Sequence, residues 1–305
     1  MCRVLVYLGR PVLLESLLLR PDNSLIRQVY DPKLLGMLNL AGFGLAAWDP
    51  ASHAGEVPFE YRVPDLPVFD SNLRSLAGKL CARGVLAHVR GVSYAESSAA
   101  IGHHNLHPFR YEGFRLAMAH NGDLARFGEM KHDLLVHMKP HIAARIRGTT
   151  DSEWMYALIM SLIADPTADL DADEIMAAVQ RALQIIREIR LNHGIRTSSS
   201  VNLFLCDGND LVATRFTFDF GCYPSHPHAA NFSYLSLWYT FGRDYGLHGG
   251  EWKMRGGLDD HDSVIVASEP LTLDRSTWIE APEYSMIYIQ RDGERWRVQT
   301  LPLDV

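Results

Sequence analysis

The feature that most constrains this chain is its first eight residues, in which a cysteine follows the initiator methionine directly and an apolar run follows the cysteine. The run contains β-branched residues and a tyrosine, which predicts a buried strand. A strand that begins at residue 2 would hold the terminus inside the fold and keep it from fraying. The alternative is a chance cysteine at an unstructured end.

A cysteine in this position can carry a nucleophile and a base on one residue. Its small side chain allows an aminopeptidase to remove Met1, which leaves Cys2 with the free α-amino group. A free thiol titrates at about pH 8.5 and an α-amino group at about pH 7.7–8.0. The neutral amine can therefore accept the thiol proton at working pH, directly or through one water. The terminus predicts Cys2 as a nucleophile for attack on a carbonyl.

Composition excludes several classes of protein. The 305 residues are 47% hydrophobic and 21% charged, which allows a sizeable core and argues against a disordered chain. A net charge of −7 without a dense block of Lys and Arg argues against nucleic-acid binding. The four scattered cysteines resemble neither a disulfide framework nor a zinc site, so a reducing, cytoplasmic compartment is expected. No segment predicts a membrane span or a signal peptide.

Hydrophobic patterns predict strands at both ends of the chain and helices between them. Strands are expected at 2–8, 43–48, 85–89, 114–120, 201–206, 211–218, 232–238, 263–267, 285–290 and 296–301. Helices are expected at 73–82, 131–147 with a break or kink at Pro140, 154–164 and 171–192. The proline-rich stretch 57–70 predicts an irregular loop. This order indicates a layered α+β fold with sheets packed inside helices.

Chemically useful residues collect at the ends of three predicted strands. Besides Cys2, they are Arg90 after the strand 85–89 and the Asn121-Gly122 pair after the strand 114–120. A side-chain amide and the backbone N–H that follows it can stabilise an oxyanion. A guanidinium at a buried strand end needs an anionic partner, for which a substrate carboxylate is one candidate. The alternatives are an ordinary Asn-Gly turn, a surface arginine and, for Asp151, a helix cap.

Five histidines invite a metal hypothesis, namely His88, His103, His104, His107 and His120. The H-H-x-x-H spacing lacks a companion acid at ligand distance, and adjacent side chains in an extended segment point in different directions. Histidines in polar loops are more often exposed or paired, so no metal site is predicted.

Taken together, these motifs resemble the class-II, N-terminal-nucleophile glutamine amidotransferases, and most closely their short stand-alone, γ-glutamyl hydrolase-like branch. The resemblance is carried by five motifs in order, with VIVASEP (264–270) as a later match: Met1-Cys2-Arg3, His88-Val89-Arg90-Gly91, Asn105-Leu106-His107-Pro108-Phe109, Ala119-His120-Asn121-Gly122 and Thr150-Asp151-Ser152-Glu153. The five motifs cover residues 1 to about 160, and weaker similarity continues to the C-terminus. Each motif is weak alone, and their common order makes the match specific.

The resemblance implies a fold and a role for each matched residue. It implies a four-layer αββα sandwich with two antiparallel sheets between helix layers, formed by one domain over 1–305. Cys2 would be the nucleophile, with Asn121 and Gly122 as the oxyanion hole. Arg90 would bind the α-carboxylate of a glutamyl group and Asp151 its α-ammonium, and His107 would lie in the loop that lines the pocket. No metal or organic cofactor is expected.

The implied reaction is hydrolysis of a γ-glutamyl, glutamine-type amide through a thioester on Cys2, which releases glutamate. The alternatives are a glutaminase subunit that supplies ammonia to a separate synthase, and a non-catalytic scaffold. A small-molecule substrate is expected, and a protein partner or a homo-oligomer stays open. Ala41 stands where close relatives carry an acidic residue, and Leu106 where a threonine is common. These departures affect the pocket wall and hence the leaving group.

Overall fold

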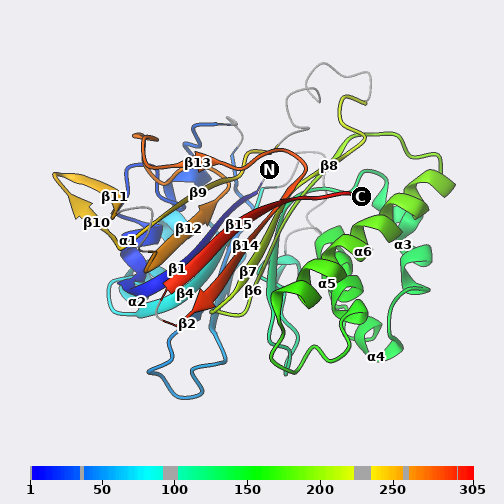
Figure 1. Cartoon of the computed structure of the whole chain (residues 1–305), viewed down its shortest axis with the longest axis horizontal. Coiled ribbons are helices and arrows are strands. Elements are labelled where there is room, and N and C mark those ends of the chain that lie inside the picture. The colour runs from blue at the N-terminus through cyan, green and yellow to red at the C-terminus, as the bar shows by residue number, and fades with distance from the viewer. Residues whose placement is uncertain (1, 35–37, 92–101, 223–234, 257–260, 294) are drawn as a thin grey trace.

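Two antiparallel sheets face each other between layers of helices in the computed structural model of the chain (Figure 1). The structure describes residues 2–34, 38–91, 102–222, 235–256, 261–293 and 295–305. The predicted four-layer αββα architecture is confirmed by this arrangement. The prediction that 1–305 form one domain stays a prediction.

The first sheet carries the N-terminal strand at its centre. Its strand order is β13-β9-β12-β1-β4-β2-β3, and every neighbouring pair is antiparallel. In chain order its strands are β1 (Arg3–Leu13), β2 (Phe43–Trp48), β3 (Phe59–Val63), β4 (Cys81–Val89), β9 (Trp238–Gly242), β12 (Ser263–Ala267) and β13 (Ile279–Glu280). A central position gives β1 hydrogen-bonded neighbours on both edges, β12 and β4, which is why the strand does not fray.

The second sheet has the order β15-β14-β7-β6-β5, and the short strand β8 also pairs with β6. Its strands are β5 (Ala117–Gly122), β6 (Ser199–Cys206), β7 (Leu211–Arg215), β8 (Thr217–Phe218), β14 (Ser285–Asp292) and β15 (Arg295–Pro302). A separate hairpin, formed by β10 (Asp244–His248) and β11 (Glu251–Arg255), projects from the side of the first sheet in Figure 1.

Helices cover the outer face of each sheet (Figure 1). The first sheet is covered by α1 (Leu14–Leu18) and α2 (Ser71–Ala77). The second is covered by α3 (Phe127–Leu135), α4 (Pro140–Ala143), α5 (Asp151–Leu162) and α6 (Ala172–Asn192). Short 3-10 turns form at Arg27–Val29, Pro67–Phe69 and His103–Asn105. Among the described residues, no helix is both long enough and apolar enough to cross a membrane.

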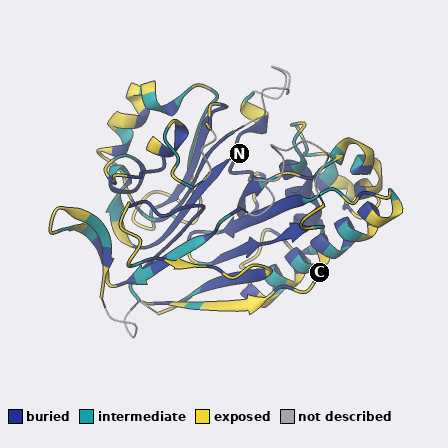
Figure 2. Ribbon diagram, turned by 90° about the horizontal axis from the view of Figure 1, so that it is seen from above, coloured by how far each residue is buried: buried dark blue, intermediate teal, exposed yellow. Residues whose placement is uncertain are grey.

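Three hydrophobic clusters separate the four layers, and the alternation of side chains along β1 shows why. Val4, Val6 and Leu8 point into the cluster between the sheets. Leu5 and Tyr7 point the other way, toward α1 and α2. Successive side chains of a strand alternate between faces, so a strand buried on both sides reads as a continuous apolar run. This burial pattern is visible in Figure 2, in which most strand residues are buried and the exposed residues of the helices lie on their outer sides.

Several predicted boundaries were wrong. The stretch 57–70, which was expected to be a loop, contains the edge strand β3. Prolines are tolerated near this strand because one of its edges has no neighbouring strand to hydrogen-bond with. The predicted break at Pro140 is confirmed, since Pro140 begins α4, but the bounds expected at 131–147 were wrong, since α3 starts at Phe127 and ends at Leu135 and α4 ends at Ala143. The strand expected at 232–238 starts only at Trp238, and residues 223–234 lie outside the described part. The pattern in 219–262 did not predict the β10–β11 hairpin.

Candidate active site

The N-terminal end of β1 brings Cys2 next to Arg90. Arg3 pairs with Val89 across the β1–β4 ladder, so continuing the antiparallel register puts Cys2 opposite Arg90. The Cys2 side chain is buried, and its Sγ lies 3.7 Å from the carbonyl oxygen of Gly91. Arg90 is also buried, and its backbone is fixed by bonds with Ala41 and Gly42. The two predicted residues therefore meet at one end of the first sheet.

The buried ion pair between Arg3 and Glu269 fixes the N-terminal end of β1. The Arg3 guanidinium donates to the Cys2 carbonyl oxygen at 2.9 Å, and its Nε lies 3.8 Å from Glu269. Glu269 also accepts the backbone N–H groups of Lys33 and Leu34. Burial lowers the pKa of Arg3, and the charge of Glu269 opposes that shift. A buried pair with its remaining hydrogen bonds satisfied holds the backbone of Cys2 in place.

The predicted oxyanion donors lie at the end of β5, in the facing sheet. Gly122 has φ +150°, and a Cβ there would lie 1.7 Å from the carbonyl oxygen of Ser200, so only glycine is accommodated. The buried Asn121 donates its Nδ2 to the hydroxyl of Ser268 at 3.1 Å. Its Oδ1 has no hydrogen-bond partner among the described residues. The sequence predicted a turn as the alternative for this pair, but both residues lie within the strand.

Ser268 connects the two sheets at this point, and sequence reasoning did not single it out. Its hydroxyl accepts the backbone N–H of Val4 at 3.0 Å as well as the Asn121 amide. A hydroxyl can accept from an amide N–H or donate to an amide oxygen, so it fixes the plane of the Asn121 amide in either orientation. One buried side chain thus ties the strand that begins beside Cys2 to the predicted oxyanion donor. The available signal was the VIVASEP motif, in which Ser268 follows directly after β12.

Asp151 connects the segment after Gly122 to the start of α5. Its Oδ2 accepts the backbone N–H of Leu124 at 2.6 Å, and its Oδ1 accepts that of Ser152 at 2.7 Å. The helix cap is Thr150, whose hydroxyl accepts from the Glu153 N–H, so the cap interpretation of Asp151 was wrong by one residue. The carboxylate is half-buried, and an ionised carboxylate has about four lone-pair sites, so it can accept further bonds.

Three buried histidines lie behind these residues. The rings of His88 and His107 are 4.1 Å apart between centroids, and none of their nitrogens has a hydrogen-bond partner among the described residues. Burial lowers the pKa of both, and for His88 the nearby Arg90 charge adds to the shift. His120 Nδ1 lies 2.9 Å from the Ser152 hydroxyl. Burial lowers the pKa of His120, whereas the Asp151 charge raises it. All three are therefore neutral at working pH.

The segment that carries His107 crosses closely over β2. A Cβ on Gly44 would lie 1.8 Å from the His107 carbonyl oxygen, so glycine is required there for the two segments to approach. The predicted role of His107 as a pocket-lining residue stays a prediction, since its ring is buried against His88 and Phe109. The exposed His103 and His104 form no cluster with acids or cysteines suited to a metal ion in the described part of the chain.

A buried thiol, a buried cation and an amide donor thus lie at the ends of strands in two facing sheets that Ser268 connects, and the half-buried Asp151 carboxylate binds the segment after Gly122. This combination of an αββα sandwich with a nucleophile at the start of a central strand defines the N-terminal-nucleophile amidohydrolases as a class. Within it, the family described as "Glutamine amidotransferases class-II" matches residues 42–232.

Individual relatives agree with this match. The chain is 30% identical over 309 residues to the probable glutamine amidotransferase DUG3 of Saccharomyces cerevisiae, which covers 95% of this chain and 82% of that protein. It is 34% identical over 95 residues to the gamma-glutamyl-hercynylcysteine sulfoxide hydrolase of Mycobacterium tuberculosis, covering 30% of this chain and 39% of that protein.

A solved structure shows the same fold. The glutamine aminotransferase class-II domain protein from Silicibacter pomeroyi matches with a TM-score of 0.61 over 99% of this chain and 100% of that chain, at 20% identity. The protein belongs to the class-II glutamine amidotransferases, which are N-terminal-nucleophile amidohydrolases, and the resemblance stated from its sequence is confirmed.

Proposed function

We propose that the protein hydrolyses a γ-glutamyl amide through a thioester on Cys2 and releases glutamate. The observation that carries the proposal is the Ser268 hydroxyl, which binds both the Val4 N–H of the nucleophile's strand and the Asn121 amide. The strand that begins beside the proposed nucleophile and the proposed oxyanion donor are therefore held by the same buried group. Such fixed geometry is what stabilisation of a developing charge requires.

The proposed reaction uses the two ends of Cys2. After Met1 is removed, the neutral α-amine takes the thiol proton, and Sγ attacks the δ-carbonyl of the substrate. The Asn121 side chain and the Gly122 N–H donate to the oxyanion. The C–N bond breaks as the ammonium returns its proton to the leaving nitrogen. Water, deprotonated by the amine, then attacks the thioester, and the thiol and glutamate are released.

Recognition of the glutamyl head group is assigned to one cation and one anion. Arg90 lies beside Cys2 in the β1–β4 ladder, where its guanidinium can bind the α-carboxylate. Asp151 is held by Leu124, two residues beyond Gly122, and would accept the α-ammonium. Opposite charges in a partly buried site discriminate strongly against amides that lack an amino-acid head group.

The relatives support two classes of substrate. One relative is named a probable glutamine amidotransferase and the other a gamma-glutamyl-hercynylcysteine sulfoxide hydrolase. Hydrolysis of a γ-glutamyl compound is the version we favour, with glutamine-dependent ammonia supply to a separate synthase as the alternative. Two residues differ from the pattern of the relatives, namely Ala41 and Leu106. Ala41 is hydrogen-bonded to the backbone of Arg90 and Leu106 precedes His107, so both are placed to affect which leaving group the pocket accepts.

A substrate panel separates these versions. Glutamate release would be measured for glutamine, glutathione and further γ-glutamyl amides, with Cys2→Ala as the matched control. Turnover of γ-glutamyl peptides by the protein alone supports hydrolysis, whereas turnover of glutamine only in the presence of a synthase favours ammonia supply. Wild-type turnover by Cys2→Ala would end the assignment of the nucleophile. Full retention of Met1 in active protein, read from its intact mass, would exclude the α-amine as the base.

A further inference from the structure

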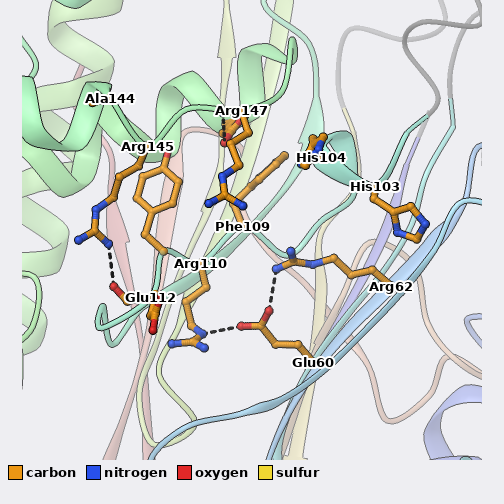
Figure 3. A pocket seen from close by; sticks show the side chains of 12 residues that line it. Glu60, Arg62, His103, His104, Phe109, Arg110, Glu112, Ala144, Arg145 and Arg147 are labelled. Atoms are coloured by element: carbon orange, nitrogen blue, oxygen red, sulfur yellow. Dashed lines mark hydrogen bonds and ion pairs between the residues drawn. The ribbon is translucent and has the colours of Figure 1, made fainter.

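A cavity of about 690 Å³ lies outside the proposed catalytic centre. It is bordered by the edge strand β3, the segment after His103 and the turn that precedes α5 (Figure 3). Cys2, Arg90, Asn121 and Asp151 do not line it. In the sheet register, Arg62 on β3 is followed by Gly44, His88 and Val4 on successive strands, so it lies three strand spacings, or about 14 Å, from β1.

Four guanidinium groups surround this cavity, those of Arg62, Arg110, Arg145 and Arg147 (Figure 3). Arg62 and Arg110 share a single carboxylate, Glu60, at 3.0 Å and 2.6 Å. Two positive charges are thus balanced by one negative charge on this side.

The other two arginines have no carboxylate within ion-pair distance in the described part of the chain. Arg145 donates to the backbone carbonyl of Glu112 and lies over the Phe114 ring. Arg147 is exposed, its backbone N–H donates to Glu153, and its guanidinium makes no hydrogen bond to another described residue. Glu153 is a lining residue but is buried, and its carboxylate accepts two backbone N–H groups, those of Arg147 and Gly148.

The remaining lining carboxylate, Glu112, lies on an exposed turn, and the exposed His103 and His104 also line the cavity. The lining therefore has a formal charge of +1 from four arginines and three glutamates, on a chain whose net charge is −7. Buried Phe109 and Tyr111 supply an apolar wall.

We propose that this cavity binds a small organic anion that carries carboxylate or phosphate groups. Guanidinium forks bind both groups through paired hydrogen bonds, and arginine is preferred wherever such planar recognition is needed. The volume lies within the usual range of small-molecule sites, and apolar walls with a few directed polar groups are typical of them. Arg145 and Arg147 supply charges that no carboxylate of the described residues pairs with.

The site shares two segments with the catalytic centre. Arg62 donates to the carbonyl oxygen of Pro108, the residue after His107. Glu153 lies two residues after Asp151 on α5 and closes the turn that carries Arg147. Arg62 and Arg147 are therefore connected, through the Pro108 carbonyl and the Glu153 carboxylate, to the segments that carry His107 and Asp151.

Calorimetric titration of the full-length protein tests the proposal without any turnover, so its result is independent of the proposed reaction. Citrate probes carboxylate recognition and inorganic pyrophosphate probes phosphate recognition. We expect saturable one-to-one binding of at least one of them, and the tighter probe identifies the preferred group. Absence of saturable binding for both would overturn the proposal.

Variants assign the binding to this cavity. Arg145→Gln and Arg147→Gln, singly and together, are expected to weaken binding by about tenfold each, as for loss of a charged hydrogen bond. Arg181→Gln removes an equal charge from the outer face of α6, where Arg181 pairs with Glu188, and should bind as the wild type does. Equal weakening in Arg181→Gln, or unchanged affinity in the double variant with its circular dichroism spectrum intact, would refute the site.

Discussion

Replacing Ser268 by alanine removes the hydroxyl that connects the strand of the proposed nucleophile to the proposed oxyanion donor. In the wild type this buried oxygen accepts the Val4 N–H at 3.0 Å and the Asn121 Nδ2 at 3.1 Å. The variant leaves both donors buried without that acceptor. A buried donor left unsatisfied costs about 1–3 kcal/mol, so we expect the free energy of unfolding to fall by about 2–6 kcal/mol.

The effect on catalysis follows from the freedom that the Asn121 amide gains. Deleting an oxyanion donor lowers kcat by about 10²–10³-fold. A donor that is present but no longer held in place should lower kcat by a smaller factor. We expect kcat to fall by about 10–100-fold. Arg90 and Asp151 keep their own contacts, so KM should change by less than about threefold.

Ser236→Ala is the matched control for this variant. The Ser236 hydroxyl donates to the Ser268 carbonyl at 2.7 Å and is not hydrogen-bonded to Val4 or Asn121, so its loss removes a neighbouring hydrogen bond without freeing the amide. Glutamate release would be measured for both variants at a temperature where denaturant titrations show them folded. Wild-type kcat in Ser268→Ala, or an equal fall in Ser236→Ala, would refute the reasoning.

Three further predictions concern the same site. Gly122→Ala should lower kcat/KM by at least about 10²-fold and destabilise the fold, because its Cβ would overlap the Ser200 carbonyl oxygen; wild-type kinetics would contradict this. Asp151→Asn should raise KM for γ-glutamyl substrates by about tenfold through loss of a charged hydrogen bond to the α-ammonium, and an unchanged KM would remove Asp151 from the site. The three buried histidines have lowered pKa values in the folded state, so below about pH 6.5 the unfolded chain binds more protons and stability falls as the pH falls. The expected loss is up to about 1.4 kcal/mol per histidine between about pH 7.5 and 5.5, partly opposed by Asp210, whose pKa burial raises to about 6. A free energy of unfolding that stays constant over this pH range in denaturant titrations would contradict this prediction.

Much of the layered fold could be predicted from local pattern. The strands at Phe43–Trp48 and Ser263–Ala267 match their predicted ranges, since both are short, fully buried and bounded by turn residues. Helix α6 was predicted within one residue because Asp171 caps it and its apolar side chains recur at helical spacing. The edge strand β3 and the β10–β11 hairpin were missed, because half-exposed strands lack a continuous apolar run.

The sequence by itself determined which groups are available: a cysteine at the start of a buried strand, a glycine after Asn121, and an arginine at a strand end. These are properties of single positions, and their order along the chain identified the family. Only the tertiary structure decided how they are joined. Ser268 is 147 residues from Asn121 and 264 from Val4, yet one hydroxyl binds both. The four arginines of the 690 Å³ cavity likewise come from separate segments of the chain. Contacts of this kind depend on strand register and packing, which no local pattern encodes.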